Sequence, residues 1–311
     1  MAGAVAQAAD LRIGIIGCDT SHATAFTRLI NDATDTNHVA GGKVVVAFKG
    51  GSPDIEESSS RVDGYTKQLQ EKYGVKLVAS VEELCKEVDV VLLESLDGRP
   101  HLEQAMPVIK AGKPLFVDKP VAGSLRDVIM LDKLAQEHHV PWFSASAYRF
   151  YGGIVEVKNA KVGEIRSVIS YGPCELEPHH PDFFWYGIHP TEALYTIMGQ
   201  GCESVVRTST KNTDVVTGIW SDGRVGTLQG QRNASGHKVI VFGSKGIAEQ
   251  KGDGDYAPLV REIMRFFQTG VSPVPNKEIV ELYAFMEAAD ESKRNGGMPV
   301  KISDVMSKNS R

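Results

Sequence analysis

The sequence of 311 residues lacks a run of about 18 apolar residues, so no segment is predicted to span a membrane as a helix. It has only four cysteines, none in a C-x-x-C pair, which argues against a disulfide framework or a structural zinc. An excess of one charge is also missing, because 34 Lys and Arg against 39 Asp and Glu give a formal net charge of −5. We therefore expect neither a membrane nor a nucleic-acid partner.

The composition is otherwise that of a folded chain, with 42% hydrophobic and 23% charged residues, and its length favours two domains. Glycine is in excess, with 31 residues. Ala6-Gln7-Ala8 matches the A-x-A cleavage pattern of an export signal, although a basic region and a full apolar region are missing. Residues 1–10 are interpreted either as the flexible terminus of a cytoplasmic protein or as the end of the export signal of a periplasmic one.

Residues 11–145 alternate between short β-branched runs and helical patterns. Strands are predicted at 11–17, 43–48, 75–79, 88–93, 115–117 and 140–145, and a clear amphipathic helix at 102–109. The polar stretch 52–63 is interpreted as a surface insertion. Repeated β-α-β units predict an α/β Rossmann domain, a doubly wound parallel sheet with helices on both faces.

Residues 146–311 follow a different pattern, with strands close together in sequence. The run at 165–171 alternates in polarity as a half-exposed strand would, and further strands are predicted at 204–210, 215–220, 224–229 and 238–242. Asp222-Gly223 predicts a hairpin between two of them. One helix is predicted at 190–198 and two more near the end of the chain. This is the pattern of an α+β domain with a large, mainly antiparallel open sheet, whose exposed face would suit a homodimer or homotetramer.

The turn after the first strand is the first candidate for binding a dinucleotide, because ligands bind at the carboxyl ends of strands in such a sheet. Against the spacing G-x-G-x-x-G, the turn has Gly17 in the first place and Asp19 and His22 in the other two, with Gly14 just before it. A carboxylate at Asp19 would repel a pyrophosphate unless it turns away, whereas Ser21 and the helix N-terminus favour an anion. A plain strand-to-helix turn is the alternative.

The end of the second strand usually carries an acidic residue for the ribose diol. Lys49 and Ser52 stand there instead, and they suit a 2′-phosphate, so the cofactor is expected to be NAD or NADP, with NADP favoured. Lys49 as plain solvated surface is the alternative. Glu94, His101 and Asp118 lie at or near further strand ends and are also candidate cofactor-binding residues.

Lys119 follows another predicted strand and precedes a proline, which favours a side chain pointing into the cleft. An ammonium group there would neutralise an alkoxide as a hydride leaves the carbon. In partly dry surroundings its pKa would fall, which would let it transfer a proton.

Two segments carry a family resemblance: 97–101 (DGRPH) through 111–114 (AGKP), and then Asp118-Lys119-Pro120. With the first strand and its glycine turn, they resemble the glucose–fructose oxidoreductase/inositol dehydrogenase (Gfo/Idh/MocA) family, in which a Glu-Lys-Pro motif follows Ala-Gly-Lys. The resemblance implies a Rossmann domain followed by an α+β domain whose open sheet often forms a dimer interface. It also implies NAD(P)-dependent chemistry on sugars, inositols and related polyols.

The resemblance further implies that Lys119 is the catalytic lysine and that a histidine of the second domain is the acid–base group. His189 fits best, although Trp185 stands where the family often has an Asp four residues earlier. Asp182 or Glu192 would then orient the imidazole. The helix N-terminus beside His189 is expected to lower its pKa and keep it neutral; a structural N-cap is the alternative.

Further residues are candidates for contact with substrate. Arg149 would hydrogen-bond a substrate group or form an ion pair between domains, and both interpretations stay open. Asp182, Trp185 and Tyr186 are further candidates, with two of the three aromatic residues at 184–186 expected to be core. The polar residues at 175–182 match no firm ligand template, so we expect a solvated or sugar-facing loop and no metal.

The predicted function is therefore an NAD(P)-dependent dehydrogenase or reductase acting on a secondary hydroxyl of a sugar, polyol or inositol-like substrate. Two alternatives stay open. In one, a transient oxidation permits glycoside cleavage or elimination with no net redox. In the other, a non-catalytic binding protein has kept the fold with a decayed cofactor site, as Asp19, His22 and Trp185 would suggest.

Overall fold

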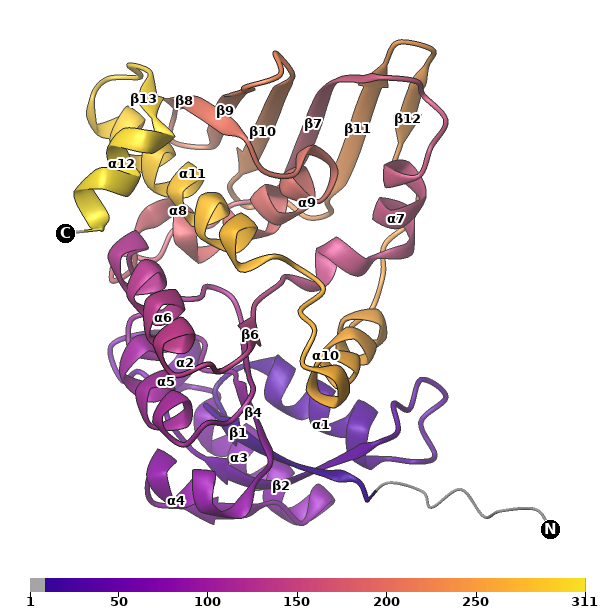
Figure 1. Ribbon diagram of the computed structural model, residues 1–311, viewed down its shortest axis with the longest axis vertical. Coiled ribbons are helices and arrows are strands. Elements are labelled where there is room, and N and C mark those ends of the chain that lie inside the picture. Colours follow the sequence, from indigo (N-terminus) through magenta and orange to yellow (C-terminus); the bar gives the residue numbers. More distant parts are fainter. Residues whose placement is uncertain (1–8, 311) are drawn as a thin grey trace.

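The computed structural model describes residues 9–310, so both interpretations of the first residues concern a segment that lies almost wholly outside the described part. Within that part no helix is both long enough and apolar enough to cross a membrane. Two sheets dominate the structure, one in each half of the chain, with helices between and around them (Figure 1).

The first half of the chain forms a parallel sheet in the order β3-β2-β1-β4-β5-β6. Its strands are β1 (Leu11–Ile16), β2 (Gly42–Phe48), β3 (Lys76–Val78), β4 (Val90–Leu93), β5 (Leu115–Val117) and β6 (Trp142–Phe143). The predicted Rossmann sheet is thus confirmed, with the classic strand order. β4 has the sequence VVLL and is buried throughout, because helices cover both faces of the sheet.

The helices of this half are α1 (Ser21–Asn31), α2 (Glu56–Ser59), α3 (Val62–Tyr73), α4 (Val81–Glu87), α5 (His101–Lys110) and α6 (Leu125–Glu137). Hydroxyl side chains of Thr20, Ser80 and Ser124 cap α1, α4 and α6 by accepting from an early helical N–H. The segment 52–63, predicted as a surface insertion, has many exposed residues, but Ile55 and Ser58 within it have no exposed area.

The second half forms a mostly antiparallel sheet in the order β12-β11-β7-β10-β9-β8-β13, in which only β7 and β10 pair in parallel. The strands are β7 (Ile165–Pro173), β8 (Cys202–Ser209), β9 (Thr213–Trp220), β10 (Val225–Gln231), β11 (Lys238–Gly243), β12 (Ile247–Glu249) and β13 (Val300–Lys301). The hairpin at Asp222-Gly223 joins β9 to β10 as predicted. β9 alternates between buried and more exposed residues, so one face of the sheet meets the core and the other stays open.

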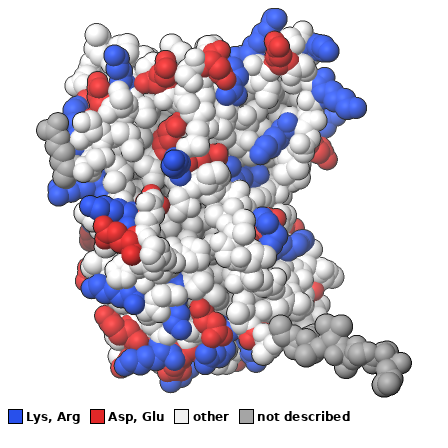
Figure 2. Space-filling view, in the orientation of Figure 1, with Lys and Arg blue, Asp and Glu red and all other residues white. Residues whose placement is uncertain are grey.

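Two helices cover the inner face of this sheet, α9 (Ile188–Met198) and α11 (Asn276–Arg294), and they lie between it and the first half (Figure 1). The remaining helices are η1 (Ala147–Phe150), α7 (Gly152–Lys158), α8 (Asp182–Trp185), α10 (Ala257–Thr269) and α12 (Ile302–Asn309). α10 returns to the first half and packs against α1, and its Phe266 ring lies 4.9 Å from the Phe143 ring of β6. On the face shown in Figure 2, basic and acidic side chains are interspersed.

Candidate functional site

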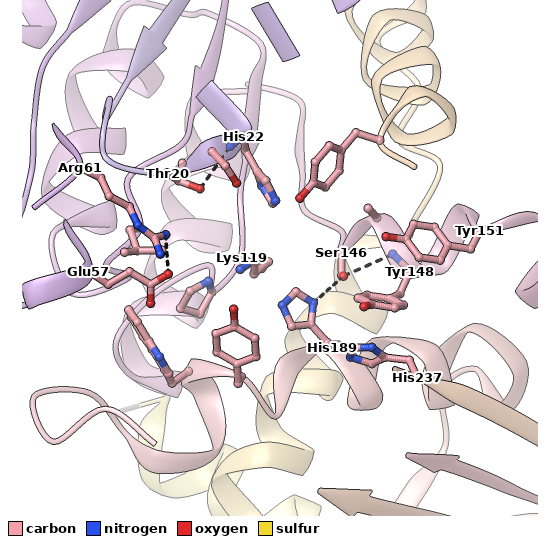
Figure 3. A pocket seen from close by; sticks show the side chains of 17 residues that line it. Thr20, His22, Glu57, Arg61, Lys119, Ser146, Tyr148, Tyr151, His189 and His237 are labelled. Carbon is pink, nitrogen blue, oxygen red and sulfur yellow. Dashed lines mark hydrogen bonds and ion pairs between the residues drawn. The ribbon is translucent and has the colours of Figure 1, made fainter. Parts of the chain in front are cut away.

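A cavity of about 280 Å³ lies between the carboxyl end of the parallel sheet and the helices beneath the second sheet. It brings together several predicted site residues from both halves of the chain: Ser21, His22, Lys119, Trp185, Tyr186 and His189. Figure 3 shows the side chains of His22, Lys119 and His189 directed toward the middle of this pocket. Residues about 170 positions apart in the sequence therefore meet at one place.

Lys119 stands just after β5, where the carboxyl ends of the parallel strands face the pocket. Its backbone N–H donates to Asp118 Oδ1 at 2.8 Å, and its Nζ lies 5.6 Å from the centroid of the Tyr186 ring. The aromatic ring stabilises the ammonium through a cation–π interaction. A positive charge is thus presented to the pocket at the position expected from the sequence.

His189 is the second residue of α9 and is 9% exposed. Its Nδ1 lies 2.9 Å from Ser146 Oγ. Burial, and then the positive charge of Lys119, hold the pKa of the imidazole well below its ordinary value. The direction agrees with the prediction, but burial is the main cause rather than the end of the helix.

The carboxylates expected to orient His189 do not touch it. Asp182 pairs with Arg207 at 2.8 Å, away from the pocket, and Glu192 pairs with Arg149. Ser146, which follows β6, takes the orienting place instead. The prediction failed because a hydroxyl 43 residues away in the chain gives no local signal.

Arg149, a candidate for either substrate contact or an ion pair between domains, is held in ion pairs with two glutamates. It is 9% exposed and pairs with Glu192 and, at 2.7 Å, with Glu278. Both carboxylates belong to helices of the second half, α9 and α11, so the ion pairs join η1 to these two helices. Its neighbours Ala147 and Tyr148 are the residues of η1 that line the pocket.

The turn after β1 differs from the predicted cofactor loop. Gly14 lies inside β1, where a Cβ would come within 2.5 Å of Leu84, so it serves helix packing rather than a ligand. Gly17 has φ +91°, and a Cβ there would meet the backbone of Ser95 at 2.4 Å, so it allows two loops to approach. The carboxylate of Asp19 is buried and points away from the pocket, accepting from Ser58 Oγ at 2.6 Å.

Three further cofactor candidates are engaged elsewhere. Lys49 pairs with Asp63 at 2.6 Å, and Ser52 donates to Asp97 at 2.6 Å, so the groups thought to suit a 2′-phosphate already have partners. His101 is fully buried, with its ring nitrogens 3.2 Å and 2.8 Å from two backbone carbonyl oxygens. It fastens the loop after β4 rather than facing the pocket.

His22, Glu94 and Asp118 form a buried cluster, of which His22 lines the pocket. His22 Nδ1 is 2.5 Å from Asp118 Oδ2, and neither oxygen of Glu94 has a hydrogen-bond partner. Burial, together with the nearby Asp118 charge, raises the pKa of Glu94 well above its ordinary value. Among the described residues these three alone have the spacing of a candidate metal site, with ligand atoms within 4.8 Å of one another.

The sequence reasoning missed several pocket residues: Glu57, Arg61, Tyr148, Tyr151, His237 and Tyr256. His237 packs on the Tyr148 ring with centroids 3.8 Å apart, and burial lowers its pKa to about 4. A Cβ on Gly172 would lie 2.3 Å from the His237 ring, so that glycine makes room for it. A lone histidine between two strands carries no signal that would have found it.

A comparison with known proteins shows which family the first half of the chain resembles. Residues 11–146 match the family model described as "Oxidoreductase family, NAD-binding Rossmann fold". The model is that of the Gfo/Idh/MocA family. The resemblance inferred from the Asp-Lys-Pro motif is therefore confirmed, while no curated protein matches the sequence.

Solved structures extend the likeness of fold to nearly the whole chain. A probable dehydrogenase from Thermotoga maritima is 21% identical, with 95% of this chain and 100% of that one covered and a TM-score of 0.76. An apo scyllo-inositol dehydrogenase from Lactobacillus casei is 15% identical, with 94% and 98% covered and a TM-score of 0.77. GenD2 from gentamicin A biosynthesis, solved in complex with NAD, is 16% identical, with 96% and 99% covered and a TM-score of 0.75.

The description of the family implies a bound NAD dinucleotide. The residues around the pocket suit the nicotinamide half of such a dinucleotide but not the adenosine half. On the nicotinamide side, the N-terminus of α1 and Lys119 line the pocket, offering N–H groups and a positive charge. On the adenosine side, the place beyond the end of β2 is filled by the chain itself, at residues 51–61.

Proposed function

We propose that this protein is an NAD(P)-dependent oxidoreductase that acts on a secondary hydroxyl of a sugar, polyol or inositol-like substrate. The observation that carries the proposal is the pairing of Lys119 with a neutral His189 in one pocket (Figure 3). A cation that stabilises an alkoxide and a base that takes its proton are the two groups that such an oxidation needs.

The chain's own residues have separable roles in this proposal. Thr20 and Ser21, at the start of α1, and Lys119 would hold the cofactor, which supplies the acceptor or donor of a hydride. The Lys119 ammonium stabilises negative charge on the substrate oxygen. With its Nδ1–H donating to Ser146 Oγ, His189 keeps Nε2 free to accept the hydroxyl proton.

The lining of the pocket supports a compact polyhydroxylated substrate. Trp185, Tyr186 and Tyr148 offer aromatic faces for the C–H side of a sugar ring, while His237 offers a polar edge. A volume of about 280 Å³ is slightly below the range of about 300–1,000 Å³ for small-molecule sites, which favours a small substrate. The inositol dehydrogenase among the structural neighbours is consistent with this class.

The test is a screen of inositols, sugars and polyols with NAD and NADP, followed by variants on the first substrate that reduces the cofactor. Lys119→Ala and His189→Ala should each lower kcat at least about 100-fold. Lys110→Ala, an exposed lysine on α5, serves as the control and should keep the wild-type rate. Near-normal rates in both pocket variants would end the assignment.

A second candidate function is elimination or glycoside cleavage with no net redox. The observation in its favour is a second imidazole, His22, which is held at Nδ1 by Asp118 and lines the same pocket as His189. Two such groups let one take a proton from carbon while the other protonates a leaving group. Product without accumulation of reduced cofactor supports this candidate, and reduced cofactor equal to product supports the first.

A further inference from the structure

The place where the adenosine half of a dinucleotide binds can be located from the topology. With the strand order 3-2-1-4-5-6, a dinucleotide crosses the switch point between β1 and β4, with its pyrophosphate at the start of α1 and its adenosine ribose beyond β2. The loops after β1, β2 and β4 therefore border that place. We call residues 51–61, which follow β2 and include α2, the strap.

The strap is fastened across this place by polar contacts to both neighbouring loops. Ser58 Oγ donates to Asp19 Oδ2 at 2.6 Å, in the loop after β1. Ser52 Oγ donates to Asp97 Oδ2 at 2.6 Å, in the loop after β4. Asp54 adds a two-point ion pair with Arg99, at 2.8 and 2.9 Å.

An apolar anchor completes the attachment. Ile55, in the middle of the strap, has no exposed side-chain area and packs with Leu96 and Trp185. The next turn places Glu57 and Arg61 in the wall of the pocket (Figure 3). The strap is thus a built part of the site rather than a loop lying over it.

Asp19 links the strap to the altered cofactor turn. It stands in the second place of the glycine fingerprint, where a dinucleotide fold needs close backbone approach to the pyrophosphate. Its carboxylate accepts from Ser58 Oγ and from Leu96 N–H, at 2.6 and 3.1 Å. The residue that breaks the phosphate-binding pattern is therefore the one that receives the strap.

We propose that the strap and the adenosine half of NAD(P) occupy the same place, so that the cofactor binds only to molecules whose strap has moved away. The proposal rests on the function proposed above, that NAD(P) is the cofactor. Gly50 and Gly51, with φ of +61° and +104°, stand at the start of the strap and supply a hinge. The apparent cofactor affinity is then the intrinsic affinity reduced by the fraction of open molecules.

Substitutions that loosen the strap should therefore strengthen cofactor binding, whereas substitutions in a loop that binds the cofactor would weaken it. Ser58→Ala leaves the buried Asp19 carboxylate without its hydroxyl donor, and Ile55→Ala removes the apolar anchor. Each should lower the Kd for NADH or NADPH, measured by fluorescence titration of the full chain, about tenfold. Ser59→Ala, an exposed serine of the same strap, is the matched control and should leave Kd unchanged.

A second measurement follows the strap itself. Saturating NADH should speed tryptic cleavage after Arg61, located by mass spectrometry. A Ser52→Cys/Asp97→Cys pair should lose NADH binding when oxidised and regain it on reduction, which keeps the proposal testable if the loosened variants fail to fold. Equal Kd values in the wild type, Ser58→Ala and Ile55→Ala, or protection of the strap by NADH, would overturn the proposal and leave the proposed function standing. Absence of NADH and NADPH binding in every variant would overturn both.

Discussion

Replacement of Arg149 gives a direct test of its assignment as a structural residue. The guanidinium is 9% exposed and lies between Glu192 and Glu278, with 2.7 Å to the latter. Arg149→Met keeps most of the side-chain volume but leaves two carboxyl groups facing each other away from water. Removing one partner of a buried ion pair costs about 3–5 kcal/mol, because the remaining charge has lost its compensation.

The expected shift in melting temperature follows from the size of the chain. An unfolding entropy of about 2.1 cal/mol/K per residue gives ~0.65 kcal/mol/K for 311 residues, so Tm should fall by about 5–8 °C in a thermal scan. Arg12→Met is the control, because its pair with Asp89 is exposed and should contribute less than about 1 kcal/mol. An unchanged Tm for Arg149→Met would refute this reasoning, and an accompanying rise in KM would restore the role in substrate binding.

Two further predictions concern pH and assembly. Burial lowers the pKa of His180 to about 4 from 6.5. Between these two pH values the unfolded chain binds a proton at this residue and the folded chain does not. The contribution of His180 to stability is therefore complete above pH 6.5 and is lost as the pH falls toward 4. Urea midpoints across that range should decline, and His180→Gln should flatten the decline; equal slopes would contradict the assignment. Ile219 and Val215 are 48% and 37% exposed on the open face of the second sheet, where we expect a homodimer. Ile219→Lys should yield monomers in sedimentation velocity, unlike the α6 surface variant Met130→Lys, and a monomeric wild type would count against this interface.

The fold was predictable because its signals are local. β4 is an uninterrupted apolar run since helices cover both faces of its sheet, and β9 alternates since one face of its sheet stays open. Lys119 could be found for a similar reason, because residues that follow parallel strands gather at one edge of the sheet.

The rest of the site depends on contacts between distant segments. From the sequence alone, the polar residues of the strap indicate a surface loop. The structure shows that Ser58 contacts Asp19, which lies 39 positions earlier in the chain. At η1 the sequence favoured Arg149, but the turn directs Tyr148 into the pocket and Arg149 toward two glutamates. The packing of the turn decides which of two adjacent side chains faces a cavity. The composition of the sequence does not contain this information.

The return of α10 to the first half of the chain limits how a ligand can enter. α10 packs against α1, and Tyr256 just before it meets the His22 ring with centroids 4.7 Å apart. On the other side, α11 packs against α6. The two halves are thus held at both flanks of the pocket, which opposes the wide hinge opening that many two-domain enzymes use. Entry and exit then depend on a local movement at the rim, and turnover would be set by how often that small segment moves.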